Sequence, residues 1–221
     1  MGRNSFFSNN NFIFRYSNYI LDMAALSILW LFLSLPVVTA GGATAALYYT
    51  VSRHTRKGHV LPYHHYLRSF KENVKVGIPC SLLTATALGL LWVGLTLMRA
   101  LAAHDGRFTI VYAMYYFACF LPLGVICYAF PLLGRFTFGF KDLILTALQL
   151  SIRHLPTTIL LVVLVVLTGC VCTSLYWAFL FLPAITTVIM SLFLERIFKK
   201  YAPEDADDAQ PEEDPLEEVS E

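Results

Sequence analysis

Long runs of apolar residues, separated by short polar segments, dominate the first two hundred positions of the chain. A helix needs about 20 mostly apolar residues to cross the roughly 30 Å hydrocarbon core of a bilayer. Four runs reach that length, and they cover residues 20–49, 76–101, 108–133 and 155–194. The pattern predicts an all-α fold, a polytopic transmembrane helical bundle in which residues 1–200 form one domain.

The last apolar run is too long for a single span. Its forty residues would make a helix of about 60 Å, roughly twice the thickness of the core. The run is least apolar at residues 168–174, and Tyr176 and Trp177, which suit a membrane–water interface, follow directly. We expect the chain to fold back here, with one span starting at Pro156 and a second covering about 178–194.

The first apolar run also exceeds one span and contains helix-breaking residues. Pro36 has no backbone N–H to donate, and Gly41 and Gly42 each lower helix stability by about 1 kcal/mol relative to Ala. Three interpretations stay open: one kinked span, a span followed by a short helix from about Thr39 back to the starting side, or a signal peptide cleaved after Ala40. The expected number of membrane helices is therefore five to six.

The break in this run is the best candidate for a functional or packing site. Unpaired backbone groups are not tolerated against lipid, so we expect residues 35–42 to be non-continuous helix packed inside the bundle. Thr39 and Thr44 are the side chains that can bond the freed carbonyls, or a ligand. The candidate residues are Pro36, Thr39, Gly41, Gly42 and Thr44.

Lysine and arginine residues are distributed unevenly among the segments between the runs. Residues 51–75 hold six, residues 134–155 hold three and residues 196–200 hold three, whereas residues 97–108 hold only two. Because basic loops stay on the cytoplasmic side, we expect a multi-pass protein of the cell membrane with two basic cytoplasmic loops and a cytoplasmic C-terminus. Residues 102–107 are then outside, and the side of the N-terminus depends on the first run.

The first basic loop contains an amphipathic pattern at residues 62–75. Tyr63, Tyr66, Leu67, Phe70 and Val74 recur at helical spacing, and His64, Arg68, Lys71 and Lys75 form a flanking basic stripe. Such a helix can lie on an anionic leaflet, dock on a cytosolic partner, or pack against the spans as an ordinary loop. The candidate contact residues for lipid or a partner are Arg68, Phe70, Lys71 and Lys75.

Side chains that carry catalytic or metal chemistry are sparse. The apolar centres between residues 76 and 194 contain no Asp, Glu, Lys, Arg or His, and no phosphate-cradling Gly loop, Ser/His/Asp order or HExxH motif is present. His54, His59, His64 and His65 lie close in sequence, but their spacing matches no standard metal-ligand motif. We therefore expect a protein that is not an enzyme, with no catalytic, cofactor-binding or metal-binding residues.

A second basic segment mixes charge with aromatic rings. Residues 135–141 alternate Phe with Arg, Thr, Gly and Lys, and a short helix is expected from Asp142 to about Arg153. Aromatic and basic residues can stack on nucleic acid, but beside membrane spans they are typical of an interfacial belt. The expected partner is the lipid bilayer and not nucleic acid.

Composition separates the end of the chain from the rest. Of all residues, 57% are hydrophobic and 14% are charged, yet ten of the fifteen acidic residues fall within residues 201–221. This proline-containing acidic tail cannot bury enough apolar surface to offset the entropy of ordering. We expect a disordered C-terminal tail that is dispensable for folding.

Several stretches resemble the YesL family of small bacterial membrane proteins, a family without an established biochemical role. They are Ser34-Leu-Pro-Val-Val-Thr-Ala-Gly-Gly-Ala-Thr-Ala-Ala-Leu-Tyr-Tyr49, Arg68-Ser-Phe-Lys-Glu-Asn-Val-Lys75, Arg135-Phe136 and His154-Leu-Pro156. The resemblance covers roughly residues 12–200, and Leu-Pro-Val-Val-Thr is its most specific part. That family has no known catalytic residues, so the resemblance assigns none to this chain.

The resemblance implies a role beside other membrane proteins. Members of that family, mostly from Gram-positive bacteria, are often found alongside binding-protein-dependent carbohydrate uptake systems and their sensor kinases. This chain is therefore expected to be an accessory of ABC-type carbohydrate uptake or its regulation, with transporter permease subunits or a sensor kinase as partners. The alternative is a small permease or channel that moves a solute by itself, which requires a polar path through the bundle.

Overall fold

The computed structural model describes residues 8–57 and 63–201, and within these ranges the regular structure is entirely helical. The helices are α1 (Ser8–Ser34), η1 (Val37–Thr39), α2 (Ala40–Lys57), α3 (Tyr63–His104), α4 (Phe108–Ala118), α5 (Phe120–Arg135), α6 (Phe140–Arg153), α7 (Leu155–Ser174), η2 (Tyr176–Leu180) and α8 (Leu182–Tyr201). The all-α prediction is confirmed for these residues. His59 and the acidic tail after Tyr201 lie outside these ranges. The predictions made for the tail therefore remain predictions.

Three helical segments are long and apolar enough to cross a membrane within the described part of the chain. They are Tyr63–His104, Phe108–Arg135 and Leu155–Ser174, and a shorter apolar helix covers Leu21–Ser34. The second of these combines α4 and α5, which a turn at Cys119 divides. The described part of the fold is therefore all-helical, with three helices whose length and composition suit a membrane span.

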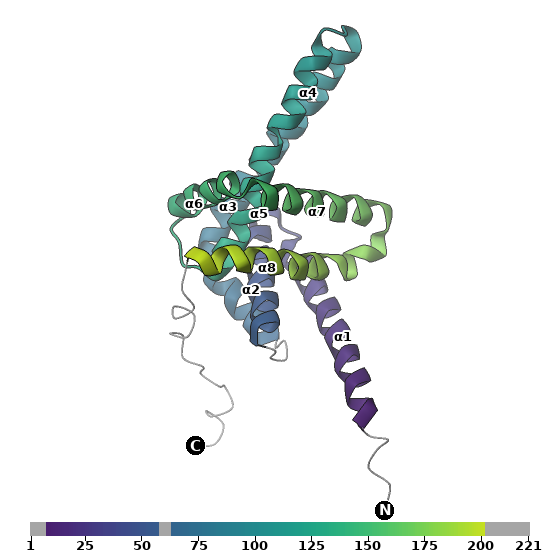
Figure 1. The fold of residues 1–221 in the computed structure, drawn as a ribbon, viewed down its shortest axis with the longest axis vertical. Coiled ribbons are helices and arrows are strands. Elements are labelled where there is room, and N and C mark those ends of the chain that lie inside the picture. Colours follow the sequence, from purple (N-terminus) through teal and green to yellow (C-terminus); the bar gives the residue numbers. More distant parts are fainter. Residues whose placement is uncertain (1–7, 58–62, 202–221) are drawn as a thin grey trace, which may run out of the picture.

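Figure 1 shows two helical hairpins that leave the centre of the molecule in different directions. The end of α3 and the antiparallel α4 project from one side, away from α1 and the N-terminus. The second hairpin, α7 and α8, lies across the direction of the first in this view. Between them α2 packs against α1, α3, α5 and α8, so it is the central helix of the bundle.

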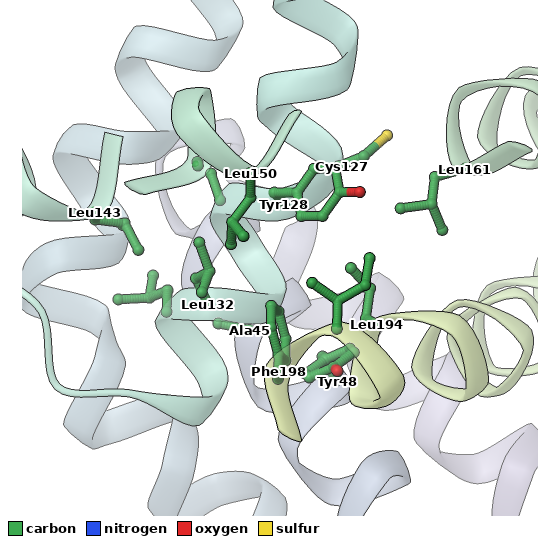
Figure 2. Packing of buried hydrophobic residues seen from close by; sticks show 14 of the residues in the cluster. Ala45, Tyr48, Cys127, Tyr128, Leu132, Leu143, Leu150, Leu161, Leu194 and Phe198 are labelled. Atoms are coloured by element: carbon green, nitrogen blue, oxygen red, sulfur yellow. The ribbon is translucent and has the colours of Figure 1, made fainter. Parts of the chain in front are cut away.

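The buried core has two parts that meet on α2. Ala45 and Tyr48 of α2 pack with Leu132 of α5 and with Leu194 and Phe198 of α8 (Figure 2). On its other side, α2 contributes a second set of buried side chains to a cluster with α1, α3 and α8, namely Ala46, Leu47 and Val51. Both clusters include side chains of α8, and the first also includes α5. The burial of α2 therefore depends on helices that come much later in the chain.

The amphipathic segment predicted at residues 62–75 is not a separate helix. It forms the first turns of α3, which continues without interruption through Pro79 to His104. At about 1.5 Å per residue, its 42 residues make a helix of roughly 63 Å, about twice the thickness of a bilayer core. The basic turns therefore extend the long apolar helix instead of forming a loop beside it.

The fold-back predicted in the last apolar run is present. Helix α7 ends at Ser174, η2 spans Tyr176–Leu180 and α8 begins at Leu182. The second helix starts four residues later than expected and continues past residue 194 to Tyr201. The added turns keep Ile197 and Phe198 in the buried core, which explains why the helix does not stop at its first charged residue.

Candidate functional site

Around the candidate site predicted at residues 36–44, the closest contact between helices is the crossing of α2 and α3. The Gly41 N–H donates a hydrogen bond of 2.7 Å to Ser81 Oγ, and that hydroxyl donates to the Gly77 carbonyl at 2.8 Å. A Cβ added to Gly41 would lie 2.6 Å from Ser81 Oγ and 2.9 Å from the Gly77 oxygen, and one added to Gly77 would lie 2.7 Å from Gly42 N. The two backbones therefore touch, and no side chain fits between them.

The chain break lies just before this crossing. Helix α1 ends at Ser34, Pro36 is extended, and α2 begins at Ala40. The Thr39 hydroxyl lies 2.6 Å from the Leu33 carbonyl and 2.9 Å from the Pro36 carbonyl, and the latter also accepts the Thr39 N–H at 2.9 Å. Thr44 donates to the Ala40 carbonyl at 2.7 Å and accepts a bond of 3.1 Å from the Trp30 indole.

The structure divides the predicted site into an outer and an inner part. Leu35 is 69% exposed and Val37 is also exposed, whereas Gly41 and Gly42 are buried in the first turn of α2. The expectation that the whole break packs inside the bundle is therefore wrong for residues 35–38. Thr39 bonds the Leu33 carbonyl locally, and η1 also contacts α3, so the exposed part of the break is covered on one side.

The four predicted contact residues on α3 do not share one surface. Arg68, Lys71 and Lys75 are exposed, and Arg68 pairs with Glu72 on the surface at 3.1 Å. Phe70 is half-buried and packs against the second core cluster, where its ring would lie 3.5 Å from a Cβ on Gly42. Only the three basic side chains are therefore available to a lipid headgroup or a partner.

A buried ion pair, which the sequence analysis missed, joins the ends of α5 and α8. Arg135 Nη1 pairs with Glu195 Oε2, and the Tyr48 hydroxyl donates a hydrogen bond of 3.2 Å to Glu195 Oε1. The guanidinium carbon of Arg135 lies 5.4 Å from the ring centroid of Phe136 and 5.6 Å from that of Phe198. Two aromatic rings and a hydroxyl thus enclose the pair, which ties α2, α5 and α8 together.

The sequence does contain a signal for this pair. Glu195 is the only acidic residue between positions 143 and 200. A carboxylate among apolar residues is too costly to bury without a cation, so it demands a partner on another helix. Arg135 was interpreted as an interfacial loop residue because nothing local indicates that α8 returns to the end of α5.

A second polar contact joins α5, α6 and α7. The buried Thr158 hydroxyl donates to the Ser151 carbonyl at 2.8 Å and lies 3.5 Å from the Tyr128 hydroxyl. Gly124 faces both Thr158 and Ser151, and a Cβ there would lie 2.6 Å from Ser151 Oγ. As at the α2–α3 crossing, a glycine allows the close approach and a hydroxyl supplies the bond.

A cavity of about 350 Å³ opens between the end of α5, α6 and α8. Its lining is mostly apolar and aromatic, with Arg153, Gln149 and Tyr201 among the polar members. The Arg153 guanidinium lies 5.5 Å from the ring centroid of Tyr201, and the Tyr201 hydroxyl is 3.2 Å from His154 Nε2. Burial, followed by the charges of Lys200 and Arg153, lowers the pKa of His154 below its usual 6.5.

Metal ligands do not gather among the residues whose side chains are described. In that part of the chain no group of three or more His, Cys, Asp or Glu side chains is placed to hold a metal ion. His64 and His65 have ring centroids 6.4 Å apart, and the side chains of His54 and His59 lie outside the described set.

The arrangement defines a class of protein, an all-helical one whose long apolar helices are suited to a membrane and are joined by buried polar contacts. The family model described as "Protein of unknown function, DUF624" matches residues 23–95. That match includes most of the apolar part of α1, the break, α2 and the larger part of α3, and hence the glycine crossing. No curated protein and no solved structure matches the chain.

Proposed function

We propose that the chain is a multi-pass protein of the cell membrane with five or six membrane helices. The outer surface of the helices supports this, because Trp92 on α3 and Phe117 on α4 are 71% and 80% exposed, and α7 exposes Ile159, Val163 and Leu167. Apolar patches of this extent are rare on soluble monomers and suit contact with lipid. The basic ends of α2, α5 and α8 then lie on the cytoplasmic side.

We further propose that the protein is an accessory of ABC-type carbohydrate uptake or of its regulation. The family match over residues 23–95 coincides with the stretch whose resemblance to the YesL family is most specific. Members of that family often accompany carbohydrate importers and sensor kinases. The partners would be the transporter's permease subunits or such a kinase, bound within or beside the bilayer.

One observation favours an accessory over an independent permease: buried polar groups between the helices bond one another. Glu195 is engaged by Arg135 and Tyr48, Thr158 by the Ser151 carbonyl, and the Thr168 and Thr186 hydroxyls are 2.8 Å apart. A solute path instead needs polar groups that face a water-filled cavity near the midplane. The network supports a static bundle that presents its outer surface to a partner.

A pull-down from membranes of the native host tests this proposal. The full chain, tagged and extracted in mild detergent, should enrich the permease subunits of a carbohydrate importer or its sensor kinase over an unrelated tagged membrane protein. The triple variant Arg68→Glu/Lys71→Glu/Lys75→Glu, which changes only exposed side chains of α3, should lower that enrichment if the partner reads the basic face. Equal recovery of these subunits with the unrelated protein would reject the proposal.

A transport assay addresses the rival function. The purified chain, reconstituted alone in liposomes, should not raise the uptake of radiolabelled mono- and disaccharides above that of empty liposomes. Uptake that depends on the reconstituted protein would favour the permease instead.

A further inference from the structure

The cavity between α5, α6 and α8 combines an apolar floor with a cationic rim. Leu132, Phe136 and Phe198 are the less exposed part of its lining, called the floor here, and Gln149, Arg153 and Tyr201 are its exposed part, the rim. The floor belongs to the principal core cluster, whereas Gln149 and Arg153 are exposed. A ligand that fits must therefore offer both an apolar part and an acceptor for a guanidinium.

Positive charge is concentrated at this rim. Arg153 lies over the Tyr201 ring, and Lys199 and Lys200 are exposed on the adjoining end of α8. The charges of Lys200 and Arg153 both contribute to lowering the pKa of His154. The nearest carboxylate of α8, Glu195, is engaged by Arg135 and Tyr48. The rim is thus suited to a negatively charged group.

The cavity adjoins an outward-facing apolar surface. Leu145 and Ile152 of α6 and Leu155 and Ile159 of α7 are all exposed. In the membrane location proposed above, lipid chains cover such residues. The junction of α6 and α7 is then at headgroup level, because α7 starts there as an apolar helix at Leu155.

We propose that this cavity is a binding site for an anionic phospholipid. One acyl chain occupies the floor formed by Leu132, Phe136 and Phe198, and the phosphate accepts hydrogen bonds from the Arg153 guanidinium at the rim. Basic pockets between membrane helices bind anionic headgroups in this way, and the planar guanidinium suits two phosphate oxygens. The inference rests on the proposed membrane location but not on the proposed accessory role.

The acidic tail is a weaker candidate for the same cavity. It begins directly after Tyr201 and its charge complements the rim, but residues 202–221 contain only Leu216 and Val219 as large apolar side chains. A mostly apolar floor discriminates against such a segment because buried carboxylates without partners are costly. A lipid satisfies floor and rim together.

Native mass spectrometry of the full chain in mild detergent tests the site. We expect dioleoyl phosphatidylglycerol to bind more tightly than dioleoyl phosphatidylcholine, which has the same chains. Arg153→Gln should weaken binding of phosphatidylglycerol about fivefold, the factor that corresponds to about 1 kcal/mol per basic group. It should weaken binding of phosphatidylcholine less, because the choline cation offsets the charge of its phosphate. Arg153→Lys should restore most of the preference.

The matched control is Arg99→Gln, which removes an exposed charge at the far end of α3. It should leave the affinity for phosphatidylglycerol unaltered, and an equal loss in both variants would overturn the assignment of the site. If Arg153→Gln does not purify as a single species, Gln149→Trp replaces it. A tryptophan there fills the rim and should lower binding of phosphatidylglycerol to the same degree.

Two further arms distinguish the sources of the anion. Competition by glycerol phosphate at equal concentration would show that a free phosphate, not a lipid, is the ligand. A rise in phosphatidylglycerol binding after truncation at Tyr201 would support the lipid site, with the tail as its competitor. Competition by glycerol phosphate rejects the proposal. Retained lipid preference in a protein that recovers no transporter subunits would reject only the accessory role.

Discussion

Arg135 and Glu195, sixty residues apart in the chain, form an ion pair whose side chains are 4% and 12% exposed. Arg135 closes the last turn of α5, and Glu195 lies in the part of α8 that packs on α2. The Tyr48 hydroxyl adds α2 to the pair. The polar centre of the molecule is therefore a tie between three helices that are distant in sequence.

Removing one partner of this pair should destabilise the protein strongly. Glu195→Leu leaves the buried guanidinium without its counter-charge, and the expected loss is about 3–5 kcal/mol in the free energy of unfolding. The double variant Arg135→Met/Glu195→Leu should recover most of that loss because it removes both charges. Both effects can be measured by heating the proteins in detergent to a series of temperatures and quantifying the folded fraction that remains by size-exclusion chromatography.

The exposed pair of Arg68 and Glu72 is the control for this prediction. Both side chains are 58% exposed, so Glu72→Leu should change the free energy of unfolding by no more than about 1 kcal/mol. A double variant at Arg135 and Glu195 that is no more stable than Glu195→Leu alone would contradict the role assigned to the charge pair.

The glycine crossing predicts unequal effects at adjacent positions. A methyl group at Gly41 meets Ser81, Phe130 and the Gly77 backbone within 2.9 Å, whereas one at Gly42 comes no closer than 3.4 Å to Val74. Gly41→Ala should therefore lower the unfolding temperature clearly more than Gly42→Ala. Gly89 lies on α3, where an added methyl group meets open space. Gly89→Ala should therefore leave the free energy of unfolding unchanged or raise it by up to about 1 kcal/mol.

Helix propensity alone treats Gly41 and Gly42 alike, because each lowers helix stability by about 1 kcal/mol relative to Ala. The structure separates the two glycines by the space around them. Leu47 is fully buried, so its truncation should cost about 2–5 kcal/mol in the free energy of unfolding. We expect the order Gly41→Leu, then Leu47→Ala, then Gly42→Ala, from most to least destabilising. A variant Gly41→Leu that unfolds at the temperature of the unchanged protein would refute the close crossing of α2 and α3.

Topology is testable with single cysteines in a cysteine-free background. Gly106→Cys lies in the turn at the tip of the α3–α4 hairpin, where nothing crowds an added side chain, and Lys57→Cys lies at the end of α2. An impermeant thiol reagent applied to intact cells should label the first and not the second. The reverse pattern would invert the orientation inferred from the basic residues.

Acidification should weaken the contact between α8 and the α6–α7 junction. The pKa of His154 is lowered in the fold, so the unfolded chain takes up the proton first as pH falls below 6.5. Stability contributed by the neutral imidazole is thus lost between pH 6.5 and the lower folded value. The unfolding temperature of His154→Gln should fall less over this range, and parallel curves for both proteins would exclude the effect.

Removal of the acidic tail should leave folding intact if the cut follows Tyr201. A truncation after Lys200 also removes Tyr201, which lies beside His154 and Arg153. We expect the chain cut after Tyr201 to elute as the full chain does, and the shorter one to unfold at a lower temperature. Aggregation of the longer truncation would show that the tail stabilises the fold.

Local patterns were sufficient for most helices and for two of their breaks, but not for the turn at Cys119. Pro36 and the polar stretch before Tyr176 both lie where the chain interrupts a helix, since missing donors and interfacial residues act within a few positions. The continuity of α3 was missed because basic residues at 68–75 were assumed to leave the membrane helix. A helix can extend into water without a break, and composition alone does not indicate where the bilayer ends.

Long-range pairing is what the sequence could not supply. Phe70 was grouped with Arg68 and Lys71 as a candidate contact for lipid or a partner, yet its ring turns to Gly42 because α2 packs on that side of α3. Likewise, the partner of Glu195 depends on where α8 returns after the turn. Such contacts follow from the packing of whole helices, which periodicity within one helix does not specify.

The central position of α2 has a consequence for biosynthesis. Tyr48 leaves the ribosome 147 residues before Glu195, the residue to which it is bonded. At 5–20 residues per second, about 7 to 30 s pass before α8 is made. Throughout that time the face of α2 that α8 later covers has no α8 on it and is open to other partners. A slowed ribosome would lengthen this interval, so the yield of correctly assembled protein should depend on the rate of translation across α3 to α7.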